Sequence, residues 1–122
     1  DLENGFFVSP TIFADVDPKS EIAQQEVFGP VLVIQKFSTE EEAIEIANST
    51  QYGLGGYIQT NDLKRAHRVA AALKTGFVHL NGSRNIPAHA PFGGLGLSGF
   101  GKEGGRPGLD EFIRLKTVSL SQ

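Results

Sequence analysis

One short segment of the chain places an acid and an aromatic ring beside a rigid turn. Residues 26–30 read EVFGP, so Glu26 and Phe28 are two residues apart and Gly29-Pro30 follows directly. A carboxylate at such a turn can accept hydrogen bonds from sugar hydroxyls, and the ring can pack on a flat heterocycle. Taken alone, the segment has a plainer interpretation, a carboxylate at a helix end and a Phe in the core.

Two glycine motifs are similar to nucleotide-binding loops, but neither has the context that such a loop needs. Residues 94–99 (GLGLSG) spell G-x-G-x-x-G, but no predicted strand precedes them and no helix follows at once. Residues 96–102 (GLSGFGK) spell G-x-x-x-x-G-K, but Glu103 stands where Ser or Thr must meet a magnesium ion. An unrelated nucleotide-binding module is therefore the last of the functional alternatives.

The remaining reactive side chains do not form a familiar catalytic set. The three histidines, His67, His79 and His89, lack metal-ligand spacing, so we expect no metal site. The chain has no Cys, which excludes disulfides, thiolate metal ligands and a cysteine nucleophile. It also has no G-x-S-x-G elbow of a serine hydrolase. From residue chemistry alone, catalysis by this chain on its own is not expected.

Hydrophobic patterning predicts alternating strands and helices in the first half of the chain. We expect an edge strand over residues 6–14, interrupted by Pro10, and a short helix over residues 20–27. The apolar run Val31–Ile34 predicts a strand buried on both faces. Ser38 or Thr39 then caps a helix that reaches Asn48, with three glutamates in its first turn.

The second half continues the same alternation. It is predicted to contain a strand over residues 56–60, a helix capped by Asn61 or Asp62, and a strand over residues 77–81. This order predicts an α/β fold with a parallel sheet flanked by helices. A glycine-rich loop follows from Gly82 to about Gly104, then a helix favoured by Pro107, and the segment Thr117–Leu120 alternates like a half-exposed strand.

Composition limits the class of protein. The chain has 122 residues, enough for one domain, and its net charge of −3 argues against nucleic acid as a partner. No apolar run approaches the ~20 residues of a membrane span and no signal-peptide pattern is present, so a cytoplasmic location is expected. The chain contains no Met, so we expect it to be processed or part of a longer protein.

Several blocks of the sequence occur in the same order in one enzyme family. They are residues 5–13 (GFFVSPTIF), 25–31 (QEVFGPV), 47–48 and 52–54, 76–81 (GFVHLN), 91–94 (PFGG), 98–99, 101–103 (GKE) and 116–118 (KTV). Together they resemble the NAD(P)-dependent aldehyde dehydrogenase superfamily over nearly the whole chain. The resemblance implies that the chain is the C-terminal quarter of such an enzyme.

The resemblance also implies a fold and a division of the chain. Residues 1–115 would be the C-terminal portion of the catalytic domain, a partial three-layer α/β/α arrangement around a parallel sheet. Residues 116–122 would be an oligomerisation strand. Its members Thr117, Val118, Ser119 and Leu120 would join the sheet of another subunit in a homo-oligomer.

Site roles follow from the resemblance residue by residue. Glu26 would hold the nicotinamide ribose of NAD or NADP, Phe28 would pack beside the nicotinamide, and Leu54 would lie near that end of the cofactor. Phe92 would line the substrate tunnel, with residues 84–86 in a variable loop beside it.

The family's catalytic cysteine, general base, oxyanion asparagine and main dinucleotide-binding fold have no counterpart in this sequence. The parent enzyme would oxidise an aldehyde to a carboxylic acid, while this chain alone would be inactive. The alternative is a non-catalytic fold or oligomerisation module.

Overall fold

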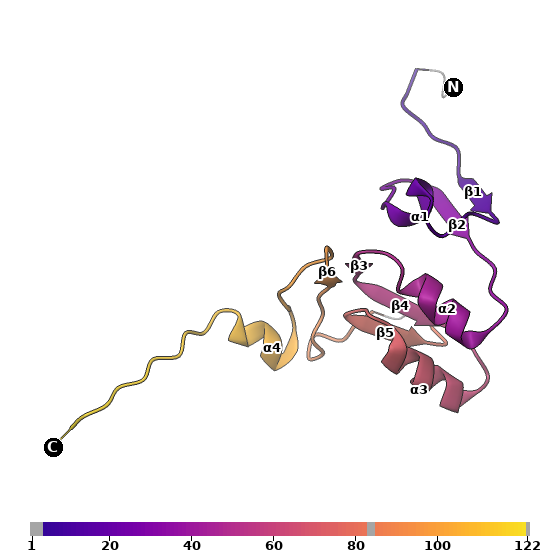
Figure 1. Cartoon of the computed structure of the whole chain (residues 1–122). Coiled ribbons are helices and arrows are strands. Elements are labelled where there is room, and N and C mark those ends of the chain that lie inside the picture. The colour runs from indigo at the N-terminus through magenta and orange to yellow at the C-terminus, as the bar shows by residue number, and fades with distance from the viewer. Residues whose placement is uncertain (1–3, 83–84, 122) are drawn as a thin grey trace. The chain divides into compact units, whose positions relative to one another are not determined.

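The structure is a computed structural model that describes residues 4–82 and 85–121 (Figure 1). The chain divides into two compact units, Asp1–Gln51 and Tyr52–Gln122. Each unit is a small mixed α/β piece that contains one pair of parallel strands joined through a helix. The predicted α/β class is therefore confirmed at this level.

The first unit is built on β1 (Thr11–Ala14), α1 (Glu21–Gln24), β2 (Val31–Ile34) and α2 (Glu40–Ala47). β1 pairs in parallel with β2, and α1 lies in the crossover that parallel strands require. β1 is shorter than predicted and begins directly after Pro10, whose missing N–H would have cost the ladder a donor. α1 is likewise shorter than the predicted helix over residues 20–27.

The predicted cap of α2 is present. Thr39 is the N-cap, and its Oγ1 accepts a hydrogen bond from the Glu42 N–H at 3.1 Å. The Glu42 carboxylate reaches back and accepts from the Ser38 N–H at 2.7 Å. The glutamate run thus forms the first turn of a helix, where carboxylates interact favourably with the helix dipole.

The second unit contains β3 (Tyr52–Gly53), β4 (Gly55–Ile58), α3 (Leu63–Ala72), β5 (Phe77–Leu80), β6 (Leu95–Gly96) and α4 (Gly105–Asp110). β4 and β5 are parallel and α3 connects them; β3 and β6 form a two-residue antiparallel pair. The N-cap of α3 is Asp62, whose Oδ1 accepts from the Arg65 N–H at 3.0 Å.

Asn81 fastens the carboxyl ends of β4 and β5. Its Oδ1 accepts from the Thr60 N–H at 2.8 Å, its Nδ2 donates to the Thr60 carbonyl at 2.9 Å, and its N–H donates to the Ile58 carbonyl at 2.8 Å. The backbone of Asn81 has a φ of 54°, a left-handed conformation that Asn tolerates better than most residues.

Two expectations about the sheet are corrected. β2 is not buried on both faces, because the side chains of Leu32 and Ile34 are 55% and 45% exposed. Both point to the same face of the β1–β2 pair, and that face is left open. The described residues form three two-stranded sheets instead of one continuous sheet. The three-layer arrangement stays a prediction.

The C-terminal tail is not a strand in the single chain. Residues 113–121 form neither helix nor strand. A strand needs a neighbouring backbone to pair with, and within the described residues none pairs with Thr117–Leu120.

The apolar core is small. Ala66 of α3, 1% exposed, is the one fully buried hydrophobic side chain among the described residues. Leu63, which the helical period places on the same apolar face, is exposed at the start of the helix. Large apolar side chains in both units therefore face solvent.

Candidate functional site

Glu26 and Phe28 lie on an open turn that leads from α1 into β2. The Gly29 N–H donates to the Val27 carbonyl at 2.7 Å, and the Val31 N–H donates to the Gly29 carbonyl at 2.8 Å. These two tight turns fix the backbone, while Glu26 is exposed and the Phe28 side chain is 98% exposed. Phe28 is therefore not a core residue of this chain, and a ligand could reach both the ring and the carboxylate.

Leu54 lies in the second unit, in the single-residue break between β3 and β4. Its carbonyl accepts from the Phe77 N–H at 3.2 Å. The preceding Gly53 is buried, donates its N–H to Ser98 Oγ at 3.0 Å and accepts from the Gly76 N–H at 3.0 Å. The backbone at Leu54 is thus held from both sides, and its side chain remains partly exposed.

Phe92 is held by its backbone and by its ring. Phe92 and Glu103 exchange two backbone hydrogen bonds, each 2.8 Å long, in an isolated antiparallel bridge. The Phe92 ring is half-buried and lies 5.3 Å from the Phe77 ring, centroid to centroid. The next residue, Gly93, has its carbonyl against Gly76 at a distance that leaves no room for a Cβ at position 76.

The structure brings Leu54 and Phe92 together. Both line one hollow of about 370 Å³ in the second unit, with the glycine loop and Lys102 forming other walls. The sequence-predicted cofactor residue and the sequence-predicted substrate residue of this unit therefore share a cavity. Glu26 and Phe28 share their turn in the first unit. Thr117–Leu120 do not line this hollow.

A second cavity in the same unit has aromatic walls. The strand register places Tyr57 opposite His79, and the alternation of side chains puts both rings and Phe77 on one face of the β4–β5 pair. The Tyr57 and His79 rings stack at 5.5 Å with 14° between their planes. Phe92 closes the cavity, which has a volume of about 520 Å³ and also contains Glu103. Phe92 thus lines both hollows. Of the variable loop, Ile86 lines this cavity, while Arg84 lies outside the described residues.

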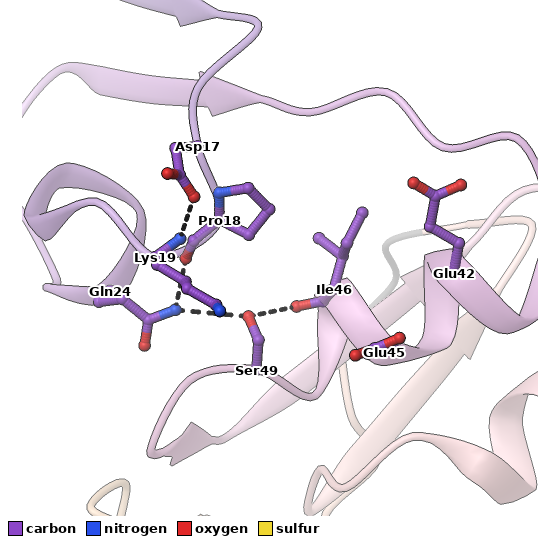
Figure 2. Close-up of a pocket in the computed structure, with 8 residues that line it drawn as sticks. All are labelled: Asp17, Pro18, Lys19, Gln24, Glu42, Glu45, Ile46 and Ser49. Carbon is purple, nitrogen blue, oxygen red and sulfur yellow. Dashed lines mark hydrogen bonds between the residues drawn. The ribbon is translucent and has the colours of Figure 1, made fainter.

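A third cavity, of about 580 Å³, lies within the first unit between α1 and α2 (Figure 2). Gln24 Nε2 donates to the Pro18 carbonyl at 2.6 Å and to Ser49 Oγ at 3.4 Å, and Ser49 Oγ donates to the Ile46 carbonyl at 2.7 Å. Of these, the Gln24–Ser49 hydrogen bond alone joins α1 to the segment that follows α2, while the other two are local. None of the sequence-predicted site residues lines it.

Two general findings concern metals and membranes. Within residues 4–82 and 85–121, no group of three or more His, Asp or Glu side chains is arranged to hold a metal ion. Over the same residues, no helix is both long enough and apolar enough to cross a membrane.

Comparison with known proteins identifies the family. Residues 1–118 match the aldehyde dehydrogenase family. The chain belongs to this family. It is 50% identical to the peroxisomal aminoaldehyde dehydrogenase 2 of Pisum sativum and 48% identical to the betaine aldehyde dehydrogenase of Bacillus subtilis, in each case over 97% of this chain and 24% of the relative. It therefore spans about a quarter of the length of these relatives.

A solved structure of the same family agrees in fold. The aldehyde dehydrogenase of Mycobacterium tuberculosis, crystallised with NAD+, superposes with a TM-score of 0.89 and is 45% identical. The match covers 98% of this chain and 25% of that enzyme. The resemblance drawn from the short sequence blocks is thus confirmed at the level of the family.

The sequence does not indicate the contacts of some residues in the candidate site. Lys102 and Ser98 stand out in the sequence only as members of glycine motifs and of the blocks that resemble the family, and neither context indicates these contacts. Their contacts join segments far apart along the chain, so no local periodicity indicates them. The aromatic face is easier to predict from the sequence, because residues 77 and 79 are two apart on a predicted strand and therefore point to the same side.

Proposed function

We propose that this chain is the C-terminal portion of an NAD(P)-dependent aldehyde dehydrogenase, which oxidises an aldehyde to a carboxylic acid. The observation that carries the proposal is the family match over residues 1–118 together with relatives at 48–50% identity that are named aldehyde dehydrogenases. The NAD+ in the M. tuberculosis structure supports a nicotinamide cofactor. When bound, that cofactor accepts the hydride removed from the substrate.

In this proposal Glu26 and Phe28 hold the nicotinamide end of the cofactor. Their fit is supported by the open turn, which leaves the carboxylate and the ring accessible while two short hydrogen bonds fix the backbone. A carboxylate accepts strong hydrogen bonds from ribose hydroxyls, and a planar ring packs on a planar heterocycle. The turn would therefore orient the ring of the cofactor.

Leu54 and Phe92, both in the second unit, are proposed to have separate roles. Leu54 would lie near the cofactor, and Phe92 would line the path of the aldehyde. Their place in one hollow of about 370 Å³ supports these roles. Both side chains are apolar, so they would exclude water and restrict the orientation of the substrate without taking part in proton transfer.

The chain alone lacks the means to complete the reaction. It has no Cys to serve as nucleophile, so no carboxylate of the described residues has a cysteine to activate as a general base. The tail Thr117–Leu120 would join the sheet of another subunit of a homo-oligomer. The exposed tail also favours the second candidate function, a non-catalytic oligomerisation module.

The deciding experiment compares this 122-residue chain with the longest polypeptide encoded around it. We expect the long polypeptide to form NADH or NADPH when an aldehyde is added, and the purified chain to form none. Aldehyde-dependent turnover that stays with the short chain through repurification would contradict its predicted inactivity. Lack of turnover by a folded long polypeptide, with each cofactor and a range of aldehydes, would favour the oligomerisation module.

A further inference from the structure

Lys102 makes an uncommon set of contacts for a lysine. Its side chain is half-buried, and its Nζ donates hydrogen bonds to the carbonyls of Gly93 and Gly94, both at 3.0 Å. Its backbone N–H donates to Glu111 Oε1 at 3.2 Å. The ammonium thus uses two of its three donors on consecutive peptide units directly after Phe92.

These peptide units need such a restraint. Glycine has more backbone freedom than any other residue, and two glycines in a row follow Phe92. A larger residue could not replace Gly93, because a Cβ there would collide with the Gly101 carbonyl and lie 2.9 Å from the Lys102 Cδ. The segment must therefore consist of glycines, which leave its backbone flexible, and yet its backbone must be held in one position. A charged donor on two successive carbonyls achieves this, since charge-assisted hydrogen bonds are stronger than neutral ones.

The restraint reaches Phe92 from its C-terminal side. The backbone of Phe92 is fixed to Glu103, the residue after Lys102, by the two-bond bridge. Lys102 then fixes the following two carbonyls, so residues 92–94 are held against residues 102–103 along their whole length. Phe92 lines both the hollow that contains Leu54 and the aromatic cavity, so a change in this backbone would alter the shape of both.

We propose that Lys102 is a positioning residue for substrate binding: its ammonium holds the Gly93 and Gly94 carbonyls and thereby sets where the Phe92 ring stands in the path of the aldehyde. This inference rests on the proposed function. Lys102 itself contacts neither aldehyde nor cofactor in this role. Its effect is on the shape of the cavity.

The kinetic test uses the full-length polypeptide that contains this segment. Lys102→Met keeps the length of the side chain and removes its donors. We expect the KM for the aldehyde to rise about tenfold while kcat stays within about twofold, because productive binding depends on the placement of the ring. Lys102→Arg retains two or more donors and is expected to restore most of the lost affinity. The matched control is Lys64→Met, at an exposed lysine of α3 that does not line either cavity.

The split between KM and kcat separates positioning from loss of structure. A loss of folded enzyme lowers kcat at unchanged KM, and this result would overturn the proposal. So would an equal rise of KM in Lys64→Met, or failure of Lys102→Arg to recover affinity.

A second readout does not need activity, so it remains decisive if the wild-type polypeptide oxidises no aldehyde and the proposed function fails. With para-fluorophenylalanine incorporated at position 92, fluorine NMR reports the surroundings of that ring. We expect Lys102→Met to shift the resonance towards its solvent-exposed position, and Lys102→Arg and Lys64→Met to leave it near the wild-type position. An unchanged resonance in Lys102→Met would refute the positioning role directly.

Discussion

At the scale of single residues, the turn at Glu26 combines an ordered backbone with exposed side chains. The backbone is fixed by two short hydrogen bonds, while the carboxylate and the Phe28 ring remain in solvent. A ligand that binds such a turn need not pay for ordering the main chain. In the proposed role, the direction of the Glu26 carboxylate would set the position of a bound hydroxyl, so we expect its charge to matter less for affinity than for orientation.

We predict that Glu26→Gln, in the full-length polypeptide, slows hydride transfer more than it weakens cofactor binding. A hydrogen bond to a charged group contributes about 1.5–3 kcal/mol, and a share of it here goes into orienting the nicotinamide ring. Single-turnover kinetics measures the hydride-transfer step, and a cofactor titration measures the dissociation constant. The matched control is Glu41→Gln, an exposed glutamate in α2. An unchanged transfer step combined with weaker cofactor binding would show that Glu26 only anchors.

Sequence alone predicts part of this site for a physical reason. Glu26, Phe28 and the Gly-Pro turn are adjacent along the chain, so their proximity needs no tertiary structure. The meeting of Leu54 and Phe92 depends on the β3–β6 pair, which has two residues in each strand. So short a pair has no period to detect. The Lys102 contacts likewise depend on how the glycine loop folds back on itself.

At the scale of elements, the caps were predictable and the burial was not. Thr39 and Asp62 cap their helices because each side chain accepts a hydrogen bond from the N–H three residues further along the chain. The β4–β5 and β1–β2 pairs follow the predicted strand–helix–strand order. The full burial predicted for β2 is wrong because burial depends on what covers a sheet, and a strand sequence contains no information on whether that cover is present in the chain.

Asn81 supports a prediction at this scale. In Asn81→Ala, the end of β4 loses two side-chain hydrogen bonds, and Ala must adopt a left-handed backbone. We expect the carboxyl ends of β4 and β5 to lose about 1–2 kcal/mol of local stability. Amide hydrogen exchange reports this directly, because the Thr60 N–H loses its acceptor and exchanges about tenfold faster or more.

Asn61→Ala is the matched control for this experiment, because Asn61 is also an exposed asparagine, at the N-terminal side of α3. It is expected to leave exchange at Thr60 unchanged. If the Thr60 amide of Asn81→Ala exchanged at the wild-type rate, the bonds of Asn81 would have no part in fastening the two strands.

At the scale of the whole molecule, the chain has more apolar surface than its own residues cover. Only Ala66 is fully buried among the described hydrophobic side chains, and the open face of the β1–β2 pair carries Leu32 and Ile34. Contiguous exposed apolar surface on a soluble chain indicates an interaction surface or promotes aggregation. A chain that spans about a quarter of its relatives is expected to show this property when it is isolated.

We therefore predict that the purified chain associates with itself and that its tail contributes. Val118 and Leu120 are 86% and 88% exposed, and unpaired backbone in an extended tail can pair with a second chain. Deleting residues 118–122 is expected to reduce association while leaving the helix content largely intact, since α4 ends at Asp110. Replacing Val118 and Leu120 by Ser tests whether the apolar side chains or the length of the tail is responsible.

Sedimentation over a range of concentrations measures association, and circular dichroism measures helix content. A monomer at high concentration for the intact chain would mean that the tail pairs within its own fold, and the interpretation of Thr117–Leu120 as an intersubunit strand would be wrong for this chain.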